Sequence, residues 1–421
     1  MTTALVVSRL FPFSDQQVHG VYQRLAMQVE ALGRVAARVH CLFLVPPQGA
    51  CTAEQLSEHQ ERLRRLWSPA LSLQVAPVVY QAPSLSRWQR VGKGIYEFYE
   101  QAIARPLNNP QAVGVVRMAL ESQPDLILAH RLSSMSVFMR LAAELNGRPL
   151  FFDLDDIEHV AFARRLLHHP GYPRERLMLL QTPRLWAAEL QAMRLATSTF
   201  VCSEPDRRYL SRFVGAARVQ TVPNSARFPS LNEEDVSNPT ILFIGSMANQ
   251  PNAQAVDVLV QRIWPKVRAK VADARLVIIG SGAEATRAYP AKDPSVSFAG
   301  FVGDLAPWYR DARVVCCPIY HGSGTRVKII EAAAHAKAIV STRLGAEGLE
   351  FEDGREIMLR DTPQALADAC VQLLQSASSA QRLGLAARAR AAELYEHGAI
   401  VRRLERIFAT AGDSARVPEP R

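Results

Sequence analysis

The stretch HGSGTRVKIIEAAAHAKAIVST, residues 321–342, sets the fold prediction for this chain. Gly322-Ser323-Gly324 allows a tight turn and close approach of a ligand, because glycine accepts backbone conformations that other residues avoid. From Thr325 onward, apolar residues recur with the spacing of a helix that buries one face, and the apolar strand Ala338–Ser341 follows. The stretch therefore predicts a loop, a helix and a strand in succession.

The start of this helix is a candidate anion site. Unpaired N–H groups and the positive end of the helix dipole face whatever lies before the first turn. Arg326 and Lys328 place two cations where the dipole disfavours them, which indicates an anionic ligand, and Glu331 lies further along the helix. The pattern favours a phosphate site with a carboxylate behind it. An ordinary loop–helix–strand packing unit is the alternative, because glycine motifs give false positives.

Strands and helices alternate on both sides of this stretch. In the second half the predicted strands are 240–244, 275–279, 296–299 and 314–317, and the predicted helices are 253–271, 305–311, 363–376, 380–395 and 400–409. In the first half a strand at 4–8, a helix at 21–31 and a strand at 38–44 form a βαβ opening. The first βα turn lacks GxGxxG, which argues against dinucleotide binding. Gly20 opens the following helix and either starts it or lets a phosphate approach.

Two further predicted strands of the first half end on polar residues. One ends at His130, and the next, 150–153, ends in an acidic cluster of Asp153, Asp155, Asp156 and Glu158. Ligands of open α/β sheets bind at the carboxyl ends of strands, so these residues are functional candidates. The alternative for His130 is a purely structural role. The alternative for the acidic cluster is that its carboxylates cap the next segment and pair with Arg164 and Arg165. The basic stretch 164–176 is expected to be a loop.

The length of the chain and a polar segment near its middle predict two domains. The polar segment 225–239 has two prolines and no periodicity, which is typical of a linker. We expect a Rossmann-like domain over 1–224, a second over 240–395, and a terminal helix and tail over 396–421 that cross back to the first domain. The facing strand ends of two doubly wound domains would form one interdomain cleft.

Charge is concentrated in the first half. Residues 1–231 hold 26 lysine and arginine residues against 18 aspartate and glutamate residues, which accounts for most of the net charge of +9. Basic residues alternate with aromatic ones at 62–67 and 87–93, which is consistent with contact to an anionic membrane surface. A solvated arginine-rich surface is the alternative. These runs lack the aromatic signature of RNA-binding modules, so no nucleic-acid partner is expected.

Targeting and metal signals are missing from the pattern. We expect no membrane-spanning helix, because no window approaches the necessary apolar length, and we interpret the N-terminus as a core strand and not a signal peptide. The six cysteines show no CxxC pair, which indicates neither a disulfide framework nor a zinc site. The expected setting is the cytoplasm or the inner face of the cytoplasmic membrane.

The second half resembles the C-terminal domain of retaining glycosyltransferases of family 4, which have the GT-B fold. The resemblance covers residues 222 to about 395 and is carried by FIGSM (243–247), RIWPKVRAKVADARLVIIGSG (262–282), FAGFVGDLAPWYRDARVVCCPI (298–319) and GSGTRVKIIEAAAHAKAIVSTRLGAEGLEFEDG (322–354). The first half resembles the family at Gly20, 128–130, Ser203 and 222–224. The implied fold is two doubly wound Rossmann-like domains that face a cleft.

The resemblance also implies roles for individual residues. Glu331 would bind the donor ribose, and Arg326 and Lys328 would hold the donor diphosphate with the backbone of Gly322, Ser323, Gly324 and Thr325. The nucleobase would meet Phe301 and Val302, whereas Gly245, Ser246 and Gly20 would lie near the phosphates. His130 would lie beside the donor sugar. Asp153 and Asp156 are weaker candidates on the acceptor side. No metal and no cofactor are expected.

Three positions depart from the family pattern. Ser323 stands where many relatives have a glutamate that contacts the transferred sugar. Met247-Ala248-Asn249 replaces a basic residue that often follows the Gly245-Ser246 position, and we expect Arg326 to substitute for it. Lys337 stands where a glycine usually precedes the strand.

The expected function is transfer of a sugar, with retention, from a nucleoside-diphosphate sugar to a glycan, lipid-linked or small-molecule acceptor. Cell-surface polysaccharide or glycoconjugate biosynthesis is the expected pathway. A non-catalytic nucleotide-sugar-binding protein and a GT-B nucleotide-sugar epimerase are the alternatives.

Overall fold

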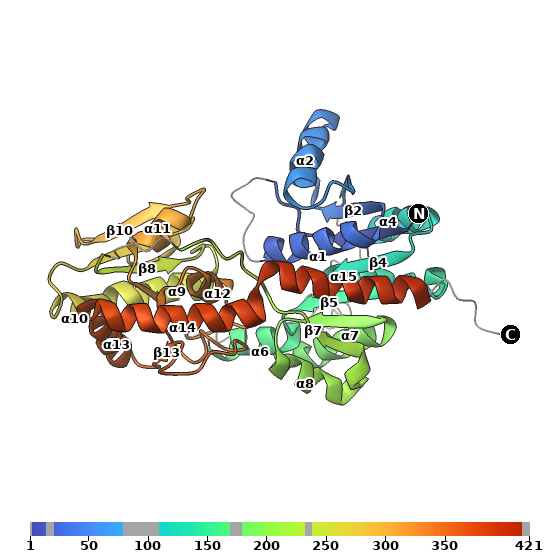
Figure 1. Cartoon of the computed structure of the whole chain (residues 1–421). Coiled ribbons are helices and arrows are strands. Elements are labelled where there is room, and N and C mark those ends of the chain that lie inside the picture. The colour runs from blue at the N-terminus through green and yellow to red at the C-terminus, as the bar shows by residue number, and fades with distance from the viewer. Residues whose placement is uncertain (1, 14–20, 79–108, 169–178, 232–237, 415–421) are drawn as a thin grey trace, which may run out of the picture. The chain divides into compact units, whose positions relative to one another are not determined.

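The computed structural model describes residues 2–13, 21–78, 109–168, 179–231 and 238–414 (Figure 1). They form two compact units, one of Met1–Val222 with Ala399–Arg421 and one of Pro223–Gly398. Among the described residues, no helix combines the length and the apolar character needed to cross a membrane. Each unit is described by itself.

The first unit is built on a seven-stranded parallel sheet in the order β3-β2-β1-β4-β5-β6-β7. Its central strands are nearly continuous apolar runs, as strands covered on both faces require. Their bounds are β1 Thr3–Ser8, β2 Arg38–Val45, β3 Leu71–Pro77, β4 Leu126–His130, β5 Leu150–Asp155, β6 Ser198–Val201 and β7 Val219–Thr221.

Helices connect these strands. They are α1 Val21–Val35, α2 Ala53–Leu66, α4 Pro110–Glu121, α5 Leu132–Arg140, α6 Glu158–His168, α7 Thr182–Leu195 and α8 Glu204–Val214, with short 3₁₀ turns at Pro47–Gly49, Ala142–Leu145 and Ala216–Arg218. Ser203 is the N-cap residue of α8, because its side chain accepts a hydrogen bond from the Asp206 N–H. The predicted loop over 164–176 is wrong at its start, because α6 continues to His168.

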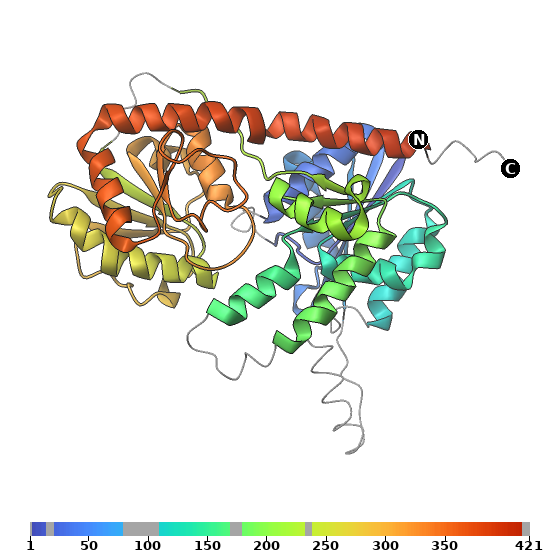
Figure 2. The same ribbon diagram turned by 90° about the horizontal axis from the view of Figure 1, so that it is seen from below.

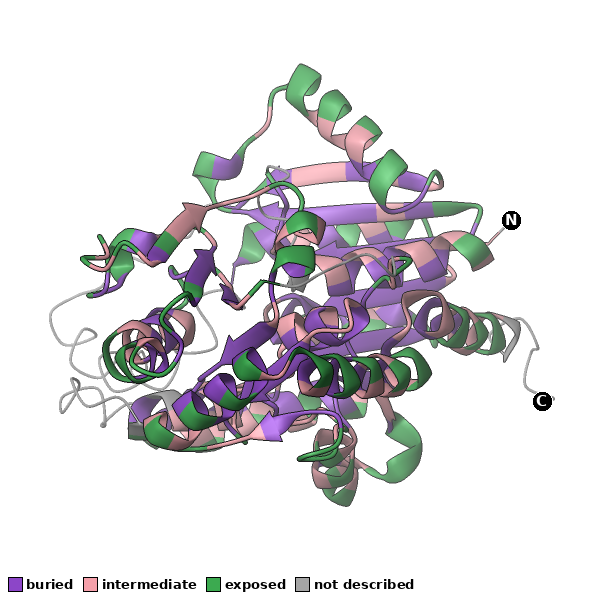
Figure 3. Cartoon of the chain, turned by 60° about the vertical axis from the view of Figure 1, so that its left-hand side comes forward, coloured by how far each residue is buried: buried purple, intermediate pink, exposed green. Residues whose placement is uncertain are grey.

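Alternate residues of one strand enter different cores of the first unit. Leu5 and Val7 of β1 pack in one hydrophobic cluster, whereas Ala4 and Val6 pack in the other. The sheet is therefore covered on both faces, and its interior is buried (Figure 3). The second cluster includes residues of α15 (His397–Ser414), the helix that ends the described chain.

The second unit contains a six-stranded parallel sheet in the order β10-β9-β8-β11-β12-β13 (Figure 2). The strands are β8 Thr240–Ile244, β9 Arg275–Ile279, β10 Val296–Gly300, β11 Val314–Cys317, β12 Ala338–Ser341 and β13 Met358–Leu359. The helices are α9 Gln250–Val258, α10 Trp264–Arg268, α11 Ala306–Asp311, α12 Val327–Ala334, α13 Pro363–Gln375 and α14 Ala377–Tyr395, with a 3₁₀ turn at Ala283–Ala285.

Two predicted segments of this unit differ from the structure. The single helix predicted over 253–271 is interrupted by a π-helical turn at Leu259–Ile263, just before Pro265, whose missing N–H breaks the regular hydrogen-bond ladder. The segment 225–239 does not stand apart as a linker in its described part. Ala226 is buried in the core of the second unit and pairs with Glu396 in an isolated β-bridge.

Candidate functional site

The carboxyl ends of parallel strands place the predicted residues of the second unit along one edge of its sheet. Ile244 ends β8 before Gly245 and Ser246, Gly300 ends β10 before Phe301 and Val302, and Cys317 ends β11 before the glycine-rich loop. The loops after β8 and β9 are joined, because the Met247 N–H donates to the Ser281 carbonyl over 2.8 Å. Ligands of such sheets bind at this edge.

Lys328 lies against the loop after β8. Its Nζ donates to the Asn252 Oδ1 over 2.8 Å and lies 4.3 Å from the centroid of the Phe243 ring, a cation–π contact. The Asn252 Nδ2 in turn donates to the Ser246 carbonyl over 2.8 Å. A Cβ at Gly245 would lie 2.6 Å from Nζ, so a side chain at this position would displace the lysine from the loop.

The burial and the unused N–H donors of the Lys328 ammonium suit it to bind an anion. Burial lowers its pKa to about 8, with a further lowering by Arg326 and opposing effects of Cys317 and Glu331. An ammonium has three N–H donors, and Asn252 is the one hydrogen-bond acceptor that the described residues give this one. Two donors thus remain at a partly desolvated cation, beside the start of α12.

Arg326 is not part of the helix, contrary to the prediction that the helix begins at Thr325. It is the N-cap residue of α12, and its Nη1 donates to the carbonyls of Ser323 and Gly324, the second over 2.7 Å. Gly322 and Gly324 have φ of 108° and 78°, as the predicted tight turn requires. The guanidinium therefore braces the loop, and its Nε and Nη2 donate to none of the described residues.

The second turn of α12 carries Glu331, which is half-buried. Burial and the charge of Glu331 hold the pKa of Tyr309 well above its usual value, which places the phenol and the carboxylate close together. The Tyr309 ring stacks on His335 with centroids 4.3 Å apart. Thr325 is also held, because its Oγ1 accepts a hydrogen bond from Asn224 Nδ2 over 2.8 Å.

The first unit holds a buried charge cluster at the carboxyl edge of its sheet. Arg24 of α1 donates to both carboxylate oxygens of Asp153 over 2.6–3.0 Å and to the Val222 carbonyl over 2.6 Å. The side chains of Arg24 and Asp153 have no exposed surface. A buried ion pair of this kind is costly to break, because one charge would be left without its partner.

His130 packs against the same cluster. Its Nδ1 lies 3.0 Å from Ser8 Oγ, and its Nε2 lies 3.8 Å from Asp153 Oδ2 without a hydrogen bond to any described residue. Burial, which outweighs the attraction of Asp153, lowers the pKa of His130 to about 4, so the imidazole is neutral at physiological pH. The side chain has no exposed surface in this structure, and its place beside a donor sugar stays a prediction.

Strained backbone marks the ends of β4 and β5. Asp155 and Arg131 have φ of 61° and 66°, a region that non-glycine residues rarely adopt, and Arg131 Nη2 donates to Asp155 Oδ2 over 2.6 Å. Such strain clusters at functional sites. Two carboxylates of the acidic cluster pair with arginines of other elements, Asp153 with Arg24 and Asp155 with Arg131. The expected pairing with Arg164 and Arg165 stays a prediction.

Two more carboxylates follow β5. Asp156 is half-buried directly after Asp155. Burial and the neighbouring charge of Glu189 raise the pKa of Glu158 to about 7, so this group titrates near neutral pH. The described residues contain no group of histidine, cysteine and carboxylate side chains that could hold a metal ion.

Some predicted features lie outside the described residues or were missed. Gly20 and the basic run 87–93 fall in segments that are not described. Arg24 and Asn252 were missed, because no local pattern distinguishes them from other polar residues of their helices. Their partners, Asp153 for Arg24 and Lys328 for Asn252, lie far away in the sequence and come close only when the sheets form.

Comparison with known proteins supports the same architecture. Residues 238–376 match the family model described as Glycosyl transferases group 1. The phosphatidyl-myo-inositol mannosyltransferase of Mycobacterium leprae (strain TN) is 28% identical over 207 residues, which are 48% of this chain and 53% of that protein. The matched part thus spans about half the length of this curated relative.

Solved structures resemble the whole chain. Sucrose-phosphate synthase from Thermosynechococcus elongatus has a TM-score of 0.67 at 17% identity, covering 98% of this chain and 100% of that one. Anabaena HepE in complex with UDP-glucose has a TM-score of 0.64 at 15% identity, covering 97% and 100%. At such identities the likeness establishes the fold. The chain has the GT-B fold of two Rossmann-like units, and its second unit matches the group 1 glycosyl transferase family model.

Proposed function

We propose that this protein is a retaining glycosyltransferase of family 4 that moves a sugar from a nucleoside-diphosphate sugar to an acceptor hydroxyl. The observation that carries the proposal is the ammonium of Lys328, held against the Gly245 loop with two donors available. The match of residues 238–376 to the group 1 glycosyl transferase model supports it. A relative that matches about half of this chain is a phosphatidyl-myo-inositol mannosyltransferase.

The donor is bound by the second unit. Lys328 and the free donors of Arg326 contact the diphosphate, together with the backbone of the loop that Arg326 braces. Glu331 accepts hydrogen bonds from the ribose hydroxyls, and Phe301 and Val302 meet the nucleobase. Gly245 and Ser246 leave room for the phosphates, because glycine at 245 carries no side chain.

The chemical step follows from these contacts. The bond between the anomeric carbon and the phosphate oxygen breaks, and the acceptor oxygen bonds to that carbon on the same face. The proton of the acceptor hydroxyl passes to the departing phosphate. Negative charge grows on the leaving oxygen, so a fixed cation stabilises the transition state more than the bound donor. No divalent metal is needed in this scheme, because Lys328, Arg326 and the N–H groups of α12 take its place.

The acceptor is contacted by the first unit, where Asp153, Asp156 and His130 lie at or near the carboxyl edge of the sheet. The acceptor is a glycan, a lipid-linked sugar or a small molecule, and the pathway is assembly of a cell-surface polysaccharide or glycoconjugate. The site of action is the cytoplasm, or the inner face of the membrane.

One observation favours a second candidate, a non-catalytic nucleotide-sugar-binding protein. Ser323 replaces the carboxylate that contacts the transferred sugar in many relatives, and its carbonyl is bound by Arg326. A GT-B epimerase is a third candidate without an observation of its own.

A two-stage screen tests the proposal. UDP-, GDP-, ADP- and dTDP-sugars are first compared by thermal shift, since a ligand at a hundredfold excess over Kd stabilises by about 2.7 kcal/mol. The best donor is then offered with a panel of acceptors, and product is measured with Lys328→Ala as the control. We expect one donor class to stabilise the wild type and to be turned over.

Glu331→Gln separates the ribose role from a general loss of function. The variant should weaken donor binding by about 1.5–3 kcal/mol, the range for a hydrogen bond to a charged group, without unfolding. Binding without turnover on every acceptor favours the second candidate. If no nucleoside diphosphate stabilises the folded protein, the proposed donor site is wrong.

A further inference from the structure

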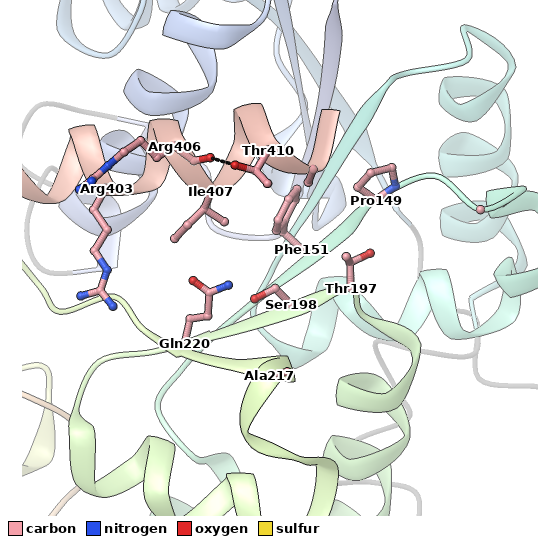
Figure 4. Close-up of a pocket in the computed structure, with 12 residues that line it drawn as sticks. Pro149, Phe151, Thr197, Ser198, Ala217, Gln220, Arg403, Arg406, Ile407 and Thr410 are labelled. Carbon is pink, nitrogen blue, oxygen red and sulfur yellow. Dashed lines mark hydrogen bonds between the residues drawn. The ribbon is translucent and has the colours of Figure 1, made fainter. Parts of the chain in front are cut away.

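A cavity of about 720 Å³ opens in the first unit at the edge of the sheet opposite the charge cluster (Figure 4). Its walls come from the amino ends of β5 and β6, from β7, and from the part of α15 between Arg403 and Ala411. β5 begins here at Leu150 and reaches Asp155 at the other edge. The cavity is therefore separate from the residues that the proposed function uses, and its volume is in the range of small-molecule sites.

Two guanidinium groups flank this cavity. Arg403 and Arg406 of α15 are exposed residues at its rim, and in Figure 4 the Arg403 side chain extends down from the helix, whereas that of Arg406 runs back along the helix toward Arg403. Arg403 makes no hydrogen bond or ion pair with the described residues. Arg406 donates through Nε to the Arg402 carbonyl over 3.4 Å and pairs with no described carboxylate. Paired guanidinium donors are the usual partners of phosphate and carboxylate groups.

The floor of the cavity holds an unpartnered hydroxyl. Ser198, the first residue of β6, is 4% exposed, and its Oγ has no hydrogen-bond partner. Figure 4 shows Ser198 and the amide of Gln220 directed toward the space below α15. Buried polar groups are nearly always hydrogen-bonded, so a donor or acceptor is expected to occupy this space.

Apolar side chains complete the wall. Phe151 of β5 and Ile407 of α15 line the cavity between the polar groups. A bare inorganic anion would leave Ser198 and Gln220 unused, because the arginines lie on the opposite wall. A ligand with an anionic end and a hydroxyl-bearing body would satisfy both walls.

We propose that this cavity binds a soluble organic phosphate monoester of the size of a sugar phosphate. The phosphate lies between Arg403 and Arg406, and hydroxyl groups of the body bind Ser198 and Gln220. A phospholipid headgroup offers the same phosphate chemistry, so the experiment distinguishes the two sources. The proposal does not depend on transferase activity.

Isothermal titration of the full chain tests the proposal with glucose 6-phosphate, inorganic phosphate, and vesicles of phosphatidylcholine with phosphatidic acid. We expect glucose 6-phosphate to bind more tightly than inorganic phosphate. Arg403→Gln and Arg406→Gln should each weaken this binding by about ten- to hundredfold, because each removes a charge-assisted hydrogen bond. Arg402→Gln removes the same charge from the same helix outside the cavity and should leave the affinity unchanged.

Ser198→Ala gives a second readout. Because Ser198 Oγ has no partner in the free protein, the variant should unfold at the same or a higher temperature, yet bind glucose 6-phosphate several-fold more weakly. Equal affinity of the Arg403→Gln, Arg406→Gln double variant and the wild type would overturn the assignment. So would equal affinity for inorganic phosphate, or binding of the vesicles alone.

Discussion

Lys328 is the residue whose environment makes the clearest prediction about pH. In the free protein burial lowers its pKa to about 8 from an ordinary 10.5, so the ammonium loses its proton as the pH rises through 8. A bound diphosphate would favour the charged form and raise the pKa again. Affinity for a nucleoside diphosphate should therefore fall as pH increases from 8 to 9, and binding in that range should take up a proton.

Titration calorimetry of UDP or the best-binding nucleotide, in buffers of different ionisation enthalpy, measures this proton. Lys328→Met should bind weakly with no uptake, and Lys328→Arg should keep its charge and lose the pH dependence. The same shift has a consequence for stability. The unfolded state binds more protons than the free folded state between about pH 8 and 10.5, so this group makes the free energy of unfolding rise with pH there. Uptake that persists in Lys328→Met would assign the proton to another group.

The Arg326 and Lys328 variants should differ in kinetics, because Arg326 holds the glycine-rich loop in place and Lys328 makes no hydrogen bond to it. Lys328→Ala removes a preorganised cation and should lower kcat by about 10²–10³ with a smaller change in donor affinity. Arg326→Ala also releases the carbonyls of Ser323 and Gly324, so it should raise the donor KM as well as lower kcat. Arg326→Lys should restore only part of the loss, because an ammonium lacks the planar fork of donors.

Steady-state kinetics on each variant measure these changes in kcat and KM, and circular dichroism checks that each variant is folded. If both alanine variants turned over within about twofold of wild type, the diphosphate would not bind at α12. Arg326 and Lys328 would then behave as ordinary surface residues, whose substitution has little effect.

At the scale of elements, the turn between α12 and β12 contains a residue in an unfavourable conformation. Ala336 has φ of 53°, and the Lys337 N–H donates to the Ala332 carbonyl over 3.0 Å, the pattern of a Schellman motif. Glycine is usual at this left-handed position. The missing glycine therefore corresponds to Ala336 and not, as predicted from the sequence, to Lys337.

Ala336→Gly should therefore stabilise the protein. Glycine relieves the left-handed strain of an L-residue, which is about 1–2 kcal/mol. It also makes the unfolded chain more flexible, which offsets about 0.4–1 kcal/mol of that gain. We expect a net gain of several tenths of a kcal/mol to 1 kcal/mol in chemical denaturation. Ala332→Gly, inside α12, is the control and should lose about 1 kcal/mol. Destabilisation by both changes would mean that the turn gains nothing from glycine.

At the scale of the whole molecule, the positive charge of the first half predicts weak binding to anionic membranes. The structure reduces the basis for this prediction, because Trp67 is buried and Arg62 donates to the Pro12 carbonyl. Exposed Arg64, Arg65 and Leu66 at the end of α2 remain. Sedimentation with anionic vesicles should show binding that fades as salt rises, since screening shortens the range of surface charges to about 10 Å at 0.1 M.

Neutral vesicles and an Arg64→Gln, Arg65→Gln variant are the controls for this measurement. Equal sedimentation with neutral and anionic vesicles, or binding that is insensitive to salt, would show that charge does not attach the protein to a membrane.

The sequence by itself determined the features that repeat locally. Periodic apolar runs gave the alternation of strands and helices, the two Rossmann-like units and the glycine-rich loop before α12, because spacing along the chain decides which face of an element is buried. The parallel order of the strands then follows, and with it the sheet edge at which Gly245, Phe301 and Lys328 lie.

Only the tertiary structure decided which side chains meet. Arg24 binds Asp153 across 129 positions, and Lys328 binds Asn252 across 76, and neither pairing leaves a local signal. The same holds for the burial of His130 and for the cavity below α15, which forms only when the final helix packs on the first sheet. Such contacts depend on the register and packing of distant elements, and spacing along the chain does not encode them.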